Sequence, residues 1–89
     1  MKVLLHKPAD KYLNRLQPAD GDRFDAAFTA LEKEPPEGGI RPYEGSPGFL
    51  RLRVGNYRAI FKIANNSIVV TYIEPRGQAY TKKIRTKRG

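Results

Sequence analysis

Two arginines, Arg51 and Arg53, alternate with apolar residues in the stretch from Leu50 to Val54. A period of two predicts a β-strand with one apolar face and one cationic face. Like charges side by side weaken a sheet unless an anion neutralises them, and the planar guanidinium group binds two phosphate oxygens at once. The pattern therefore favours a surface for a phosphate-bearing ligand. The alternative is an ordinary solvated face of cations.

Arg58 and Lys62 follow in the next apolar segment, residues 57–63, which begins after a Gly-Asn turn signal. Antiparallel pairing across that turn places Arg58 beside Arg53 or Arg51, with Lys62 further along the same strand. We therefore expect these four cations to share one side of a sheet.

The charge of the chain is segregated along its sequence. Residues 49–89 carry ten of the seventeen Lys and Arg side chains but one of the nine carboxylates, Glu74, and the formal net charge is +8. A cationic half of this kind should face a polyanion, and nucleic acid is the commonest one that a soluble protein meets. The same half contains aromatic residues that can stack on bases, namely Tyr57, Phe61, Tyr72 and Tyr80. The alternative is a basic surface that only keeps the chain soluble.

Composition narrows the classes of site. The chain has no cysteine, which excludes disulfides, thiolate metal sites and a cysteine nucleophile and fits a reducing cytoplasm. Its one histidine, His6, cannot form a metal site or a catalytic triad alone, so we interpret it as structural. Asp20, Asp22 and Asp25 lack the spacing of a calcium-binding loop and lie where a helix start favours negative charge. We therefore expect no metal and no cofactor.

The sequence contains no segment that fits a membrane. Its longest apolar stretches are far below the roughly 20 residues needed to span a bilayer. Met1 to Leu5 is too short for the apolar core of a signal peptide. We expect a cytoplasmic protein without a membrane partner.

The spacing of apolar residues predicts one strand, two helices and then three strands. Pro8 suits the first turn of the first helix. Pro18 interrupts the helical spacing of apolar residues that begins after Pro8. Asp20 or Asp22 is the expected cap of the second helix, which should stop before Pro35. The expected strands are residues 3–5, 50–54, 57–63 and 67–73, and a loop rich in proline and glycine is expected at residues 35–48.

These elements predict a single α+β domain over residues 1–81. Its two layers are a mainly antiparallel four-stranded sheet and a helical hairpin that covers one face of it, in the chain order β-α-α-β-β-β. We expect residues 82–89 to be a basic C-terminal tail that is either disordered or ordered only on the ribosome or the antitoxin.

The segment from Phe49 to Ile63, with the Ile68 to Ile73 strand and residues 76–80, resembles the RelE/ParE toxin superfamily. The specific part is an aromatic-x-Arg-x-Arg-x-Gly-x-Tyr-Arg hairpin from Phe49 to Arg58. In this superfamily the RelE branch cleaves mRNA in the ribosomal A site, whereas the ParE branch poisons DNA gyrase on much the same fold. The resemblance implies a toxin of a type II toxin–antitoxin system, with the RelE-like mRNA interferase branch favoured.

The resemblance also implies roles for single residues. Arg51 falls where the ribonuclease branch has a catalytic Lys or Arg, and Arg58 matches its phosphate-binding arginine. Glu74 departs from the pattern, because the best-known ribonuclease has an arginine there. The implied catalytic residues are Arg51, Arg58, Arg76 and Tyr80, and the implied RNA-binding residues are Arg53, Lys62, Lys82 and Lys83.

For such an enzyme the chemistry is attack of the ribose 2′-hydroxyl on the adjacent phosphate, which needs no metal. The general base is open, because an unperturbed lysine or tyrosine titrates near 10. Lys82 and Tyr80 are possible bases if a cationic pocket lowers their pKa, and Glu74 is either a base or a residue that orients Arg76. The alternatives for the whole chain are a ParE-like gyrase inhibitor and a non-catalytic RNA-binding module.

The implied partners are mRNA and the ribosome, or gyrase under the alternative, together with a cognate antitoxin protein. An acidic or amphipathic antitoxin segment would cover the basic site, and an extended antitoxin peptide could add to a sheet edge.

Overall fold

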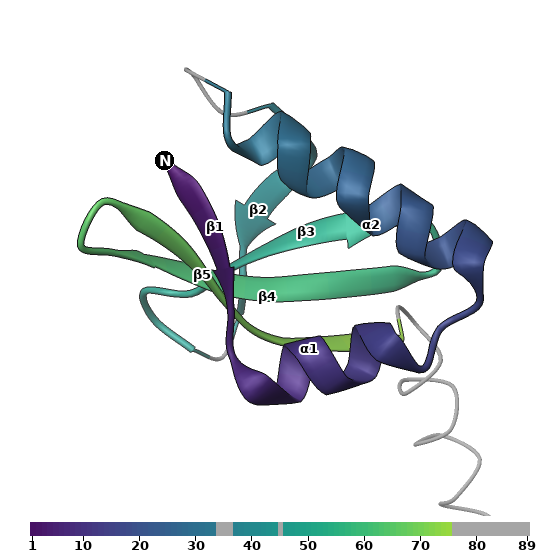
Figure 1. The fold of residues 1–89 in the computed structure, drawn as a ribbon. Helices are drawn as coiled ribbons and strands as arrows, with labels where there is room; N and C mark the ends of the chain where they lie inside the picture. Colours follow the sequence, from purple (N-terminus) through teal and green to yellow (C-terminus); the bar gives the residue numbers. More distant parts are fainter. Residues whose placement is uncertain (34–36, 45, 76–89) are drawn as a thin grey trace, which may run out of the picture.

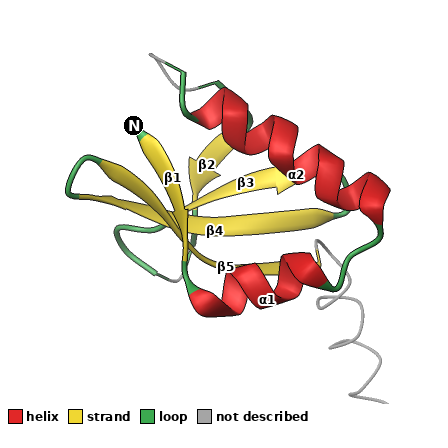
Figure 2. Cartoon of the chain, in the orientation of Figure 1, coloured by secondary structure: helices red, strands yellow, loops and turns green. Residues whose placement is uncertain are grey.

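The computed structural model describes residues 1–33, 37–44 and 46–75. Within these ranges two helices pack on a five-stranded sheet (Figures 1 and 2). The elements in chain order are β1 (Lys2–Leu5), α1 (Lys7–Asn14), α2 (Pro18–Leu31), β2 (Ile40–Pro42), β3 (Leu50–Val54), β4 (Tyr57–Ala64) and β5 (Ser67–Pro75). The α+β class and each of the predicted elements are confirmed, whereas the basic tail expected from residue 82 lies outside the described ranges.

The sheet has the order β1-β5-β4-β3-β2, with β1 parallel to β5 and every other pair antiparallel. The prediction of four strands was wrong by one, because β2 lies inside the segment interpreted as a loop. A strand of three residues is too short to show a period of two. It forms because Ile40 and Pro42 pair with Leu52 and Leu50 of β3.

Both helices contribute to one core on one side of the sheet. Ala9 of α1 and Phe24 and Leu31 of α2 are completely buried against the sheet. Burying one such large apolar side chain contributes about 1.5–3 kcal/mol. The sheet residues of this core are Leu52, Val54, Ala59, Phe61, Ile68, Val70 and Ile73.

The start of each helix carries a proline in its first turn, as the sequence predicts for Pro8. In α2 this residue is Pro18, and Gln17 is the N-cap without a side-chain hydrogen bond. The expected Asp20 or Asp22 cap was therefore wrong, because proline already has the φ of a helix and has no N–H to satisfy. Asp20 instead lies in the first turn, where a negative charge favours the helix dipole.

The strands of the meander are joined by tight turns. Gly55 has a φ of +59° in the turn between β3 and β4, at the predicted Gly-Asn position. Asn65 and Asn66 have φ values of 49° and 58° in the turn between β4 and β5. Positive φ at both central residues suits the right-handed twist of a hairpin. No helix in the described part of the chain has the length and apolar character to cross a membrane.

Candidate functional site

The sheet face away from the helices carries two pairs of arginines. Arg41 of β2 and Arg51 of β3 are direct cross-strand neighbours, and so are Arg53 of β3 and Arg58 of β4. Opposed residues of an antiparallel pair point to the same side of the sheet. The predicted placement of Arg58 beside Arg53 is therefore confirmed, and Lys62 shares this side four residues further along β4. We call this side of the sheet the open face.

Arg41 belongs to the open face but was missed in the sequence. Its strand, β2, shows no alternation of its own, so no pattern assigned the Arg41 side chain to a face. Only the pairing of β2 with β3 assigns the Arg41 side chain to the open face, because Arg41 lies opposite Arg51. Arg41 and Arg53 are exposed, whereas Arg51 and Arg58 are half-buried.

Arg58 forms an ion pair with Glu74 of β5, its direct cross-strand neighbour. The two side chains are 28% and 22% exposed, so water screens this pair less than a surface pair. The Arg58 Nε atom is buried and has no hydrogen-bond partner. Among the carboxylates of the described residues, Glu74 is the one within ion-pair distance of an open-face cation.

A register shift in the sheet creates this pair. The pairing of β4 with β5 is regular from the turn at residues 65–66 to the pair of Phe61 and Val70. The next pair is Ile60 and Tyr72, so Thr71 is an extra residue in β5 and the register shifts by one. Without that bulge Arg58 would be opposite Ile73, whose side chain lies in the core. The hydroxyl of Thr71 donates to the backbone oxygen of Ile60 at 3.0 Å and secures the bulge.

The segment between β2 and β3 places two aromatic rings next to open-face cations. Tyr43 N–H donates to the Phe49 carbonyl at 3.0 Å, which closes this segment. The Arg58 guanidinium carbon lies 5.9 Å from the centre of the Tyr43 ring, and the Lys62 Nζ lies 5.7 Å from the centre of the Phe49 ring. Both distances are in the range of cation–π contacts.

Tyr43 also contacts Tyr72 of β5, with 3.2 Å between their hydroxyl oxygens. The hydrogen bond to Tyr43, together with burial, raises the pKa of Tyr72 to about 12. Tyr72 therefore keeps its proton at neutral pH. With 38% of its surface exposed, it is accessible beside the arginines.

Two of the aromatic residues proposed to stack on bases lie in the core instead. Phe61 is 1% exposed. Tyr57 packs against Tyr12 and Phe24, with ring centres 6.0 Å and 5.9 Å away, and its hydroxyl donates to Asp20 at 3.4 Å. Tyr57 and Phe61 lie on the face of β4 opposite to Arg58 and Lys62. Because side chains of a strand alternate between faces, Tyr57 and Phe61 point to the helices.

Part of the predicted site lies outside the described residues. This applies to Arg76, Tyr80, Lys82 and Lys83, whose roles stay predictions. Glu74 contacts Arg58, and its expected role in orienting Arg76 likewise stays a prediction.

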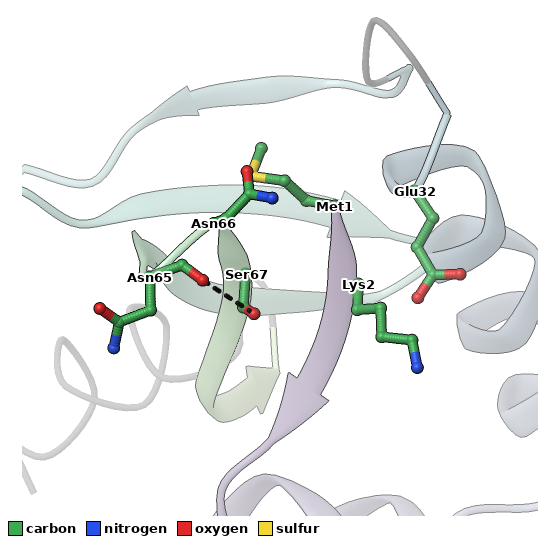
Figure 3. A pocket seen from close by; sticks show the side chains of 6 residues that line it. All are labelled: Met1, Lys2, Glu32, Asn65, Asn66 and Ser67. Atoms are coloured by element: carbon green, nitrogen blue, oxygen red, sulfur yellow. Dashed lines mark hydrogen bonds between the residues drawn. The ribbon is translucent and has the colours of Figure 1, made fainter.

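A second feature is a polar depression of about 550 Å³ at the opposite end of β5 from Glu74 (Figure 3). There the Glu32 carboxylate accepts a hydrogen bond from the Val3 N–H at 2.8 Å, which satisfies a donor on the edge strand β1. No group of three metal-ligating side chains occurs in the part of the chain that the structure describes. The depression is lined by Met1, Lys2, Glu32, Asn65, Asn66 and Ser67.

The family model of the ParE toxin of type II toxin–antitoxin systems, parDE, matches residues 3–80. The chain belongs to this family. The match includes the whole open face, and it confirms the assignment to the RelE/ParE superfamily made from the hairpin of β3 and β4. A comparison with curated proteins gave no match.

One solved structure above 30% identity places this chain on the RelE side of its superfamily. A chain of the archaeal RelE–RelB complex from Pyrococcus horikoshii is 31% identical, with a TM-score of 0.72 over 86% of this chain and 96% of that one. A chain of the RelB–RelE antitoxin–toxin complex from Methanococcus jannaschii is 20% identical, with a TM-score of 0.70 over 89% and 96%. The isolated RelE toxin of E. coli is 12% identical, with a TM-score of 0.69 over 97% of each chain. The last two likenesses show the fold alone.

Proposed function

We propose that this RelE-like toxin is a ribosome-dependent endoribonuclease that cleaves mRNA in the A site, in the cytoplasm. The observation that carries the proposal is the open face. Five cations and the aromatic rings of Tyr43, Phe49 and Tyr72 gather on or beside it. Cations that follow a phosphate backbone and rings that stack on unpaired bases are what recognition of single-stranded RNA requires.

The reaction is an internal transfer at phosphorus. The ribose 2′-oxygen forms a bond to the adjacent phosphorus and gives its proton to a general base, while the bond to the 5′-oxygen breaks and that oxygen takes up a proton. The products are a 2′,3′-cyclic phosphate and a 5′-hydroxyl. DNA lacks the attacking hydroxyl and is not a substrate.

Arg51 and Arg58 stabilise the charge that develops on the non-bridging oxygens in this proposal. Fixed donors aimed at developing charge contribute about 3 kcal/mol each when they act like a single oxyanion donor. Arg76 contributes to the same stabilisation, and Tyr80 stacks on or orients the substrate nucleotide. Binding of the flanking phosphates falls to Arg41, Arg53, Lys62, Lys82 and Lys83.

The contact of Glu74 with Arg58 argues against Glu74 as the general base. Its Oε2 atom accepts a hydrogen bond from Arg58 Nη2, so the carboxylate is occupied by the arginine rather than facing a substrate hydroxyl. A base must reach the proton that it removes. The base is then Tyr80 or Lys82.

A cognate antitoxin is the expected protein partner. The archaeal complex that is 31% identical contains a RelB chain by its description. An acidic segment would find complementary charge on the open face, and an extended peptide would find two sheet edges, at β1 and β2.

Gyrase inhibition is the second candidate. It is favoured by the description of the matching family, which names parDE, and by the pairing of Arg58 with Glu74, which removes one cation from anion binding. Expression of the toxin would then induce the DNA-damage response while translation continues. Blocked translation without that response would contradict gyrase inhibition.

Analysis of RNA ends tests the proposed reaction. Purified toxin is added to an mRNA in a bacterial translation extract and to the same RNA without ribosomes. We expect cuts only with ribosomes, with 2′,3′-cyclic phosphate and 5′-hydroxyl ends. RNA that is bound but never cut in either reaction would contradict the enzyme and support a non-catalytic RNA-binding module.

A further inference from the structure

Arg58 differs from the other cations of the open face in having an internal anion. Arg51, Arg53 and Lys62 have no carboxylate within ion-pair distance among the described residues, whereas Arg58 contacts Glu74. Together with Arg51, the same arginine is a candidate to contact the reacting phosphate. The free protein therefore presents one of its main phosphate ligands in a neutralised form.

The geometry of the Arg58 side chain leaves little room for a second anion. Glu74 Oε2 accepts from Nη2, and Nε is buried without a partner. The guanidinium also lies over the Tyr43 ring. A phosphate that binds two guanidinium nitrogens at once needs a free pair of neighbouring N–H groups, and the carboxylate now occupies part of that fork.

The pair is also fixed by the fold rather than by chance contact of long side chains. The bulge between Ile60 and Phe61 sets the register in which Glu74 is opposite Arg58. Both side chains are mostly buried, so bulk salt screens their attraction only in part. Glu74 is held on the open face as long as β4 and β5 stay paired.

We infer that Glu74 is a built-in competitor of the RNA phosphate for Arg58, so that phosphate binding at Arg58 requires displacement of the Glu74 carboxylate. The inference rests on the proposed function, because it concerns RNA at the same face. RNA first contacts the unpaired cations Arg51, Arg53 and Lys62. Arg58 joins when the phosphate replaces the carboxylate, which makes Glu74 a positioning residue that tunes affinity.

Glu74→Gln tests this inference, because glutamine keeps the size and an acceptor oxygen but removes the charge. Asp25→Asn is the matched control, since it removes one carboxylate from an exposed position on α2. The probe is a short fluorescent 2′-O-methyl RNA that cannot be cleaved, and binding is measured by anisotropy at several salt concentrations. Thermal unfolding of each variant checks that the fold is kept.

We expect Glu74→Gln to bind the RNA at least about threefold more tightly than Asp25→Asn, because the phosphate no longer has to break the ion pair of Arg58 and Glu74. The slope of log affinity against log salt should steepen by up to about 0.7, the value for one added phosphate contact on a single strand. In an Arg58→Ala background the same substitution should change affinity no more than Asp25→Asn does.

Three results overturn the inference. In the first, Glu74→Gln and Asp25→Asn bind alike while the wild type binds RNA, and the proposed function then stands without it. In the second, Glu74→Gln still increases RNA affinity in the Arg58→Ala background. Glu74 would then act only through its negative charge and not through Arg58. Failure of both wild type and Glu74→Gln to bind RNA overturns the inference and RNA recognition together, whereas binding gained only on substitution supports the inference.

Discussion

At the scale of single residues, a chain of side-chain contacts connects residues of the open face. The network runs from Glu74 to Arg58, from Arg58 to the ring of Tyr43, and from Tyr43 to Tyr72. In this network the positive charge of Arg58 is balanced by Glu74, while Arg51 and Arg53 have no carboxylate partner among the described residues.

The raised pKa of Tyr72 gives a first prediction. Folding favours the neutral form of Tyr72, so this contribution to stability is complete below pH 10 and is lost as the pH rises through about 12. In an ultraviolet titration of tyrosine ionisation, Tyr72→Phe should remove a tyrosine that ionises near pH 12. Tyr12→Phe serves as control, because its pKa is raised chiefly by burial in the helix layer and not by Tyr43. An unchanged late phase in Tyr72→Phe would contradict the hydroxyl pair.

At the scale of elements, the decisive feature is the bulge between β4 and β5. The helices, the core alternation and the hairpin of β3 and β4 follow from the spacing of apolar residues. The bulge does not, because Thr71 occupies a position in an apolar run with no glycine or other signal nearby. Pairing of Arg58 with Glu74 was therefore beyond prediction, although each residue was singled out.

The hydroxyl of Thr71 gives a prediction at this scale. Thr71→Val keeps the shape of the side chain but removes the donor to the Ile60 carbonyl, so it should lower the free energy of unfolding by about 1 kcal/mol. Thr71→Ser keeps the hydroxyl and is the matched control. Chemical denaturation measures both. A valine variant as stable as the serine variant would show that the hydrogen bond does not secure the bulge.

At the scale of the whole molecule, the two-layer architecture separates a sheet face that packs on the helices from a cationic sheet face. The cationic face was predictable, because strands at Leu50–Val54 and Tyr57–Ala64 alternate clearly. Arg41 and Tyr43 were not, since β2 exists only through its pairing with β3. Tyr57 and Phe61 were assigned to base stacking on residue type alone, and their alternation with Arg58 and Lys62 already indicated the core.

The separation of faces predicts how RNA binding depends on salt. Arg51→Ala should reduce the slope of log affinity against log salt by about 0.7, because one phosphate contact is lost. Arg15→Ala removes an arginine beside Tyr12 in the helix layer and should leave the slope unchanged. The comparison uses the same uncleavable RNA. Equal slopes for the two variants would place RNA binding elsewhere than on the open face.

Cleavage by variants of the open face tests the central claim most directly. Primer extension on a reporter mRNA in a bacterial translation extract compares wild type, Arg51→Ala and Arg15→Ala, each shown to be folded by thermal unfolding. We predict codon-positioned cuts for wild type and Arg15→Ala, and a loss of at least about a hundredfold in cleavage rate for Arg51→Ala, as expected when one donor to a developing charge is removed. Cuts of equal intensity with Arg51→Ala would contradict the assignment of catalysis to the open face.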